Sequence, residues 1–100
     1  LNDAQKDEFG KMADEVITFI SRCMLEIKRN DYTAFDQLVE KAVSISNALT
    51  QLKKNELKRI QGQSGSTKVS MVYLNMIQET QNVVSFTSNL IKVSRKFQME

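Results

Sequence analysis

The chain contains no proline among its 100 residues and only three glycines, Gly10, Gly62 and Gly65. Proline and glycine are the residues that most often end a helix, so very few positions in this sequence force a helix to stop. We therefore expect long helices. A chain of this length forms one domain in most cases, and residues 1–100 are predicted to be a single domain.

The first helix is predicted over residues 3–29. Asn2 followed by Gln5 has the spacing of a capping box, which closes the start of a helix with two side-chain hydrogen bonds. Apolar residues then recur every three or four positions, at Phe9, Met12, Val16, Phe19, Cys23 and Ile27. This period is typical of an amphipathic helix. Cys23 is the only cysteine, so it cannot form an internal disulfide, and we expect it to be a buried structural thiol.

The second helix is predicted over residues 32–61, with Asp31 or Thr33 accepting hydrogen bonds from its first backbone amides. Its apolar stripe consists of Phe35, Leu38, Ala42, Ile45, Leu49, Leu52 and Ile60. The run Gly62–Ser66 is the one loop-like segment of the chain. We expect a glycine to take the left-handed position there and Ser66 to cap the helix that follows.

The third helix is predicted over residues 67–98. A four-three spacing runs through it without interruption, at Val69, Tyr73, Met76, Thr80, Val83, Thr87, Leu90, Ser94 and Phe97. This is the most regular seam in the sequence, and we expect it to face the core. The hydroxyls of Thr80, Thr87 and Ser94 are expected to bond to carbonyls of their own helix.

Short connections force neighbouring helices to be antiparallel, so the predicted fold is all-α, an up-down-up antiparallel three-helix bundle. The third helix carries more apolar residues than one seam accounts for. The surplus residues are predicted to form an interface with a partner helix, and they are Val72, Ile77, Val84, Phe86, Ile91 and Val93.

Composition argues against most kinds of chemistry. The chain has no histidine, so it cannot form Ser-His or Cys-His nucleophiles, and it lacks imidazole metal ligands and the usual general base at neutral pH. We therefore predict that it is not an enzyme and has no catalytic residues, no cofactor and no metal site. The 14 basic and 12 acidic residues give a net charge of +2, too balanced for a nucleic-acid partner. No stretch approaches the ~18 apolar residues of a membrane span.

Charged residues gather near the predicted helix ends. The acids Asp3, Asp7, Asp14 and Glu15 lie early in the first helix, where they complement the helix dipole. Lys53, Lys54, Lys58 and Arg59 end the second helix and are interpreted as a solvated face. A second basic group is our candidate for contact with anionic lipid or phosphate, and it consists of Lys28, Arg29, Lys92, Arg95 and Lys96.

The run from Gln81 to Ile91, Gln-Asn-Val-Val-Ser-Phe-Thr-Ser-Asn-Leu-Ile, resembles the signature segment of PhoU-like helical domains, and the layout of three helices resembles half of such a unit. Members that hold metal clusters carry acids where this chain has Val43, Asn47, Gln81 and Ser85. Without those carboxylates we expect no metal binding. Asn82 and Asn89 are expected to form hydrogen bonds between helices.

The resemblance extends to the C-terminal cytoplasmic domain of bacterial sodium/phosphate cotransporter-like proteins, and a chain that starts at Leu1 fits an excised tail. It implies a non-catalytic regulatory or interaction domain that acts through helix-face contacts on the cytoplasmic side of the inner membrane. Its expected partners are its own transmembrane transporter domain or a second PhoU-like unit, with a homodimer expected for the isolated fragment.

An alternative function is a helical signalling or coiled-coil linker module of a receptor or kinase, indicated by the unbroken seam of the third helix. Such a linker would be one continuous helix in a parallel dimer, and the run Gly62–Gly65 argues against that arrangement. A metal-storage or di-metal enzyme bundle would need Glu-x-x-His pairs, which a chain without histidine cannot supply.

Overall fold

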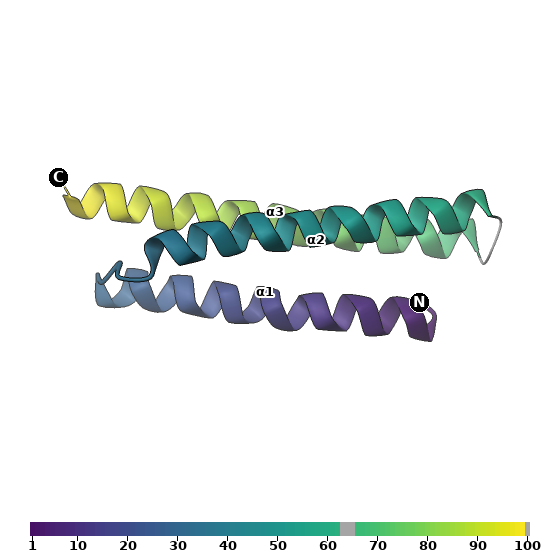
Figure 1. Cartoon of the computed structure of the whole chain (residues 1–100), viewed down its shortest axis with the longest axis horizontal. Helices are drawn as coiled ribbons and strands as arrows, with labels where there is room; N and C mark the ends of the chain where they lie inside the picture. Colours follow the sequence, from purple (N-terminus) through teal and green to yellow (C-terminus); the bar gives the residue numbers. More distant parts are fainter. Residues whose placement is uncertain (63–65, 100) are drawn as a thin grey trace.

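A computed structural model describes residues 1–62 and 66–99 of the chain. It contains three helices: α1 (Asp3–Arg29), α2 (Phe35–Gln61) and α3 (Thr67–Met99). They run side by side, each antiparallel to the one before it, and form a bundle 54 Å long and 19 by 17 Å across (Figure 1). The predicted fold, an all-α up-down-up three-helix bundle, is confirmed.

Two of the predicted helix caps are present. The side-chain oxygen of Asn2 accepts the backbone N–H of Gln5 at 2.8 Å, and Gln5 Oε1 accepts the backbone N–H of Asn2 at 2.9 Å. This is the predicted capping box. At the start of α3, Ser66 Oγ accepts the backbone N–H of Val69 at 3.4 Å. Local sequence alone therefore sets the beginning of α1 and of α3.

The start of α2 was predicted too early, at residue 32 rather than Phe35. The carboxylate of Asp31 accepts the backbone N–H of Thr33 at 3.1 Å, so it stabilises a turn before the helix instead of capping it. Ala34, at the cap position, has no capping side chain. Its backbone N–H donates instead to Glu26 Oε2 of α1 at 2.8 Å.

Helices α1 and α2 end where predicted, at Arg29 and Gln61. Asn30 ends α1 in the left-handed conformation, with φ of 53°, and asparagine tolerates that conformation better than most residues. Gly62, after α2, has φ of −77° and is not left-handed. The remainder of the predicted loop, residues 63–65, lies outside the described residues.

The core runs along the axis of the bundle. The predicted stripes of α1 and α2 supply most of it, and the buried apolar residues of these helices are Met12, Val16, Phe19, Cys23, Leu38, Ala42, Ile45 and Leu49. On α3 the predicted seam holds at Tyr73 and Thr87, which are buried, and is wrong by one position elsewhere. Its buried residues are Ser70, Tyr73, Ile77, Gln81, Val84, Thr87, Ser88 and Ile91.

Helix α3 carries two seams of the same period, about 100° apart because they differ by one residue. A three-helix bundle can bury only one of them. The buried seam contains Ile77, Val84 and Ile91, each fully shielded from solvent. Of the predicted seam, Val83 is 45% exposed and Phe97 80%. Thr80 and Thr87 do bond to carbonyls of their own helix, Met76 O at 2.7 Å and Val83 O at 2.8 Å, as predicted.

A buried polar network joins all three helices near the end of the bundle where α1 and α3 begin. Glu56 of α2 is fully buried; it accepts hydrogen bonds from Gln5 Nε2 of α1 at 3.0 Å and from the hydroxyl of Ser70 of α3. Arg59 donates to the second oxygen of Glu56 at 2.6 Å. Such a network fixes the register of the helices, because any slip would leave a buried charge without partners.

Arg59 extends the network toward the surface. Its guanidinium forms two parallel hydrogen bonds of 3.0 Å with the carboxylate of Glu8, and the hydroxyl of Tyr73 donates to the same carboxylate at 2.7 Å. Two parallel hydrogen bonds between a guanidinium and a carboxylate are the strongest geometry available to an ion pair. The basic residues that end α2 were interpreted as a solvated face, but Arg59 is part of the internal structure.

Candidate interaction surface

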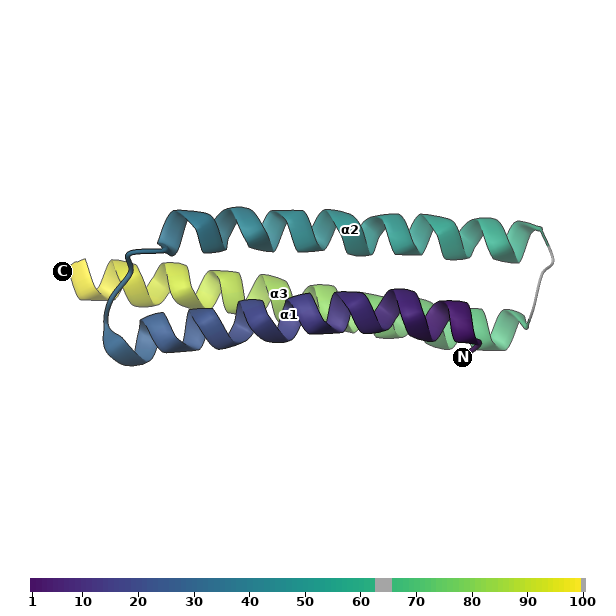
Figure 2. The ribbon, with the colours of Figure 1, turned by 60° about the horizontal axis from the view of Figure 1, so that its bottom comes forward.

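Several exposed apolar residues lie along α1 and α3, on the side of the bundle away from α2. We call this side the α1/α3 face. Its most exposed members on α1 are Ile17, 62% exposed, and Met24, 39% exposed; on α3 they are Val72 at 50% and Val83 at 45%. Helices α1 and α3 contact each other, and Figure 2 shows α1 in front of α3 with α2 above both. The face therefore belongs to two helices at once.

Helical spacing and a surface hollow both place these residues together. A hollow between the two helices is lined by Phe9, Ala13, Val16, Ile17, Glu79, Thr80 and Val83. Met24 lies two turns beyond Ile17 on α1, and the half-buried Leu90 lies two turns beyond Val83 on α3. Val83 and Leu90 of the α1/α3 face thus belong to the seam that was predicted to be core. A single unpartnered seam of this kind is the geometry that accepts another helix.

The six residues predicted as an interface separate into two groups. Ile77, Val84 and Ile91 have no exposed surface and belong to the bundle's own core, so their assignment to a partner interface is corrected. They pack inward because they form the buried seam of α3. Val72, Phe86 and Val93 are 50%, 69% and 65% exposed. These three remain accessible, Val72 on the α1/α3 face and the other two on the outer side of α3.

Between α2 and α3 lies a polar groove. It is lined by Ala42, Val43, Ser46, Asn47, Val84, Ser85, Ser88, Asn89 and Lys92. Gln81, one turn away, donates to Ser46 O at 3.0 Å and to Thr50 Oγ1 at 2.9 Å and so ties the two helices together. Asn82 was expected to do the same, but it accepts from Gln78 of its own helix at 2.9 Å. Asn89 is exposed in the groove.

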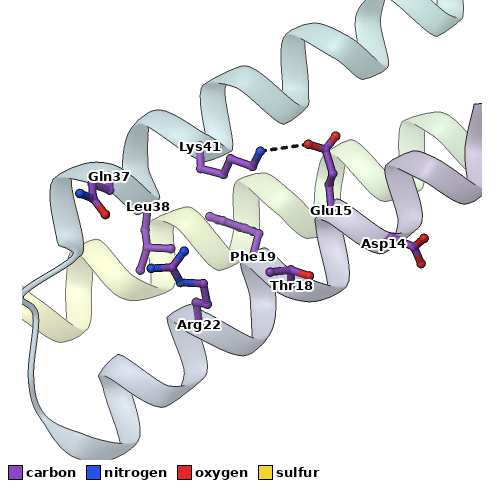
Figure 3. Close-up of a pocket in the computed structure, with 8 residues that line it drawn as sticks. All are labelled: Asp14, Glu15, Thr18, Phe19, Arg22, Gln37, Leu38 and Lys41. Atoms are coloured by element: carbon purple, nitrogen blue, oxygen red, sulfur yellow. Dashed lines mark hydrogen bonds and ion pairs between the residues drawn. The ribbon is translucent and has the colours of Figure 1, made fainter.

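A third depression lies between α1 and α2 (Figure 3). Phe19 and Leu38 form its floor, and Lys41 of α2 reaches across to Glu15 of α1 with an ion pair of 3.0 Å. Asp14 points away from α2. Both side chains of the ion pair are nearly half exposed, so water screens them and the bridge contributes little energy. The mixture of both charge signs around the rim selects no single class of ligand.

The second basic group comes together at one end of the bundle, where α1 and α3 end. Lys28, Arg29, Lys92 and Lys96 are exposed there. Arg95 lies over the ring of Phe35, with its guanidinium carbon 4.2 Å from the ring centroid. That stacking anchors the last turns of α3 to the start of α2. The structure therefore gathers residues that are more than sixty positions apart in sequence.

Carboxylates of α1 lie mostly at the surface, and no group of three or more histidine, cysteine or acidic side chains meets in the part of the chain that the structure describes. Over the same residues, no helix is both long and apolar enough to cross a bilayer.

Cys23 is fully buried, and burial raises the pKa of its thiol to about 11.

Sequence reasoning missed the network around Glu56. The sequence does contain a signal: Glu56 continues the core spacing of Leu49 and Leu52 on α2, although it is charged. Gln5 and Ser70 are polar residues on the stripes of α1 and α3 that face it.

Comparison with known proteins finds no matching family model, no matching characterised relative and no matching solved structure.

Proposed function

We propose that this chain is a non-catalytic interaction domain that acts by presenting the α1/α3 face to another helical bundle. The observation that carries the proposal is the exposed seam of Ile17, Met24, Val72 and Val83 on a bundle whose own core is already filled. Apolar surface of this extent favours association, because covering it removes the side chains from water.

A second copy of the chain is the partner that we propose for the isolated domain. A whole side of the bundle, 54 by 19 Å, has room for the roughly 800 Å² that a standard interface takes from each partner. Glu79 is the only charged residue among those lining the hollow on this face. A face with so little charge fits another face of the same kind.

We further propose that the parent protein is a sodium/phosphate cotransporter-like membrane protein, with this domain as a regulatory element on its cytoplasmic side. The resemblance of residues 81–91 to PhoU-like domains supports this assignment. So does the groove between α2 and α3, because Val43, Asn47 and Ser85, three positions that carry acids in metal-binding members, line it together. The alternative, a coiled-coil linker, requires one continuous helix, whereas this chain folds back into three.

Light scattering over a range of protein concentrations, with and without added divalent metal, tests the interaction. The wild-type chain is expected to be a dimer in both conditions. The double variant Ile17→Asp, Val83→Asp places charges in the face and is expected to be a folded monomer. Leu57→Asp on α2 is the matched control, since Leu57 is 49% exposed but lies off this face. A wild-type monomer, or a dimer that survives the double variant, would refute the proposed partner.

The assignment to a transporter needs its own experiment. The full-length protein that contains this chain, reconstituted into proteoliposomes, is expected to show sodium-dependent phosphate uptake, and its absence would refute the assignment. The same double variant is expected to change that uptake, while Leu57→Asp leaves it unchanged. Phosphate uptake that is identical in the double variant and the wild type would show that the face has no regulatory role in transport.

A further inference from the structure

The end of the bundle where α1 and α3 terminate combines exposed cations with exposed apolar side chains. In both views α3 extends beyond the ends of the other two helices (Figures 1 and 2). This projecting part carries Phe97, 80% exposed, and Met99, 71% exposed. Lys96 is exposed on the same part of α3, and Lys28 and Arg29 are exposed in the last turn of α1. We call this set the C-terminal tip.

Helix dipoles account for only half of this arrangement. Cations in the last turn of a helix complement the partial negative charge of its final carbonyls, and that explains Lys28, Arg29 and Lys96. It does not explain why Phe97 and Met99 point into water beside them. Two large apolar side chains on a protruding helix end cost solvation free energy unless a partner covers them.

The tip also has a hollow suited to an apolar group. It lies next to Phe97 and is lined by Ile27, Asn30, Tyr32, Val93, Ser94, Phe97 and Gln98. An aromatic ring, an aliphatic wall and nearby ammonium groups are the features that proteins use at the boundary between lipid headgroups and acyl chains.

The charge balance at this end favours an anionic surface. Among the described residues, Lys28, Arg29, Lys92, Arg95 and Lys96 oppose three carboxylates, Glu26, Asp31 and Asp36. Two of these acids are occupied locally: Glu26 accepts from the backbone of Ala34 and Asp31 from Thr33. The pKa of Asp31 is lowered by those Thr33 hydrogen bonds, so it stays ionised at neutral pH. Among these eight described residues the five cations exceed the three carboxylates by two charges.

The opposite end of the bundle also carries cations and exposed apolar side chains, among them Leu57 at 49% and Met71 at 52%. Its cations include Arg59, which is bound to Glu8 and Glu56, and the acids Asp3 and Asp7 lie nearby at the start of α1. Lys53 is hydrogen bonded to Gln78. Each end therefore contains several basic residues, but among the described residues the two most exposed large apolar side chains, Phe97 and Met99, lie at the C-terminal tip.

We propose that the C-terminal tip docks on the surface of an anionic lipid bilayer, with Phe97 and Met99 entering the headgroup layer and Lys28, Arg29 and Lys96 facing lipid phosphates. The proposal does not depend on the α1/α3 face or on the identity of the parent protein. Each basic residue near an anionic leaflet contributes about fivefold to partitioning, and the effect is screened within a Debye length.

Co-sedimentation of the full chain with vesicles tests this inference. Binding is expected to vesicles of mixed phosphatidylcholine and phosphatidylglycerol but not to pure phosphatidylcholine, and it should fall as sodium chloride is raised to about 0.5 M. The variant Lys28→Gln, Lys96→Gln is expected to lower the partition coefficient roughly twentyfold. Phe97→Ser should lower it about tenfold through lost apolar burial. All three positions are exposed, and circular dichroism checks that the variants fold.

The matched control is Lys53→Gln, Lys54→Gln, which removes the same charge from the opposite end and should leave the partition coefficient within about twofold of wild type. An equal loss in this control would show that net charge alone attracts the protein, and the inference would be wrong. Equal binding to neutral vesicles would overturn it too. Release by inorganic phosphate, but not by sodium chloride of equal ionic strength, would assign the tip to a soluble anion instead.

Discussion

The side-chain amide of Gln5 donates a hydrogen bond of 3.0 Å to the carboxylate of Glu56, fifty-one positions later in the chain. This bond connects the first turn of α1 to the last turns of α2, and Ser70 adds α3 to the same carboxylate. A buried carboxylate is tolerated only where donors satisfy it. The contact therefore fixes how the three helices are aligned along the bundle.

Glu56→Ala is expected to lower the free energy of unfolding by about 3 kcal/mol, because it leaves Gln5 and Ser70 without their buried acceptor and breaks an ion pair with Arg59. Urea unfolding followed by circular dichroism measures the loss. Glu40→Ala, an exposed carboxylate on the same helix, is the control and should change stability by less than about 0.5 kcal/mol. A loss below about 1 kcal/mol for Glu56→Ala would show that the network contributes little.

Stability should depend on pH through the same carboxyl group. Burial alone raises the pKa of Glu56, but hydrogen bonds from Ser70, Gln5 and Arg59 outweigh burial and hold the pKa below its ordinary value of 4.5. A group with a lowered pKa in the folded state stabilises the fold above its unfolded pKa, and this stabilisation disappears as pH falls through the folded value.

We expect the contribution of Glu56 to be constant from about pH 7 to pH 5 and to decline below about pH 4.5. Thermal unfolding across this range measures it. Glu56→Gln should be less stable at neutral pH and should show a shallower decline in acid, while Glu40→Gln keeps the wild-type slope. Parallel curves for wild type and Glu56→Gln would contradict the assignment.

The register of α3 makes a separate prediction. Leu49 on α2 is fully buried, and Leu49→Ala is expected to cost about 2 to 5 kcal/mol. Leu90 is only half buried because it belongs to the outer seam, so Leu90→Ala should cost less, under about 2 kcal/mol. Chemical denaturation of both variants decides the point. Equal losses would favour the seam from Val69 to Phe97 as the core.

Cys23 should be unreactive in the folded protein. Its thiol has no exposed surface, and burial raises its pKa to about 11, whereas thiolate is the reactive form. Alkylation by iodoacetamide at about pH 8 should proceed only as fast as the bundle opens, and should become rapid in urea. Mass spectrometry over time follows the modification. Labelling of the native chain at the rate of a free cysteine would show that α1 separates readily from the core.

The sequence by itself determined the helices and most of the fold. Without proline, and with caps at Asn2 and Ser66, the chain has few choices other than long helices, and the four-three patterns of α1 and α2 identify their buried sides. These features are local: a hydrogen bond three residues away or a side chain one turn away decides them. Short connections then leave antiparallel packing as the simple solution.

Only the tertiary structure decided which seam of α3 is buried. Both seams have the same period, and the choice depends on what α1 and α2 present: a backbone carbonyl at Ser46 and a hydroxyl at Thr50 for Gln81, and a carboxylate at Glu56 for Ser70. The start of α2 is similar, since Glu26 of another helix binds Ala34. Val83 and Leu90 of the other seam stay at least partly exposed on the α1/α3 face, because a bundle of three helices buries one side of each helix.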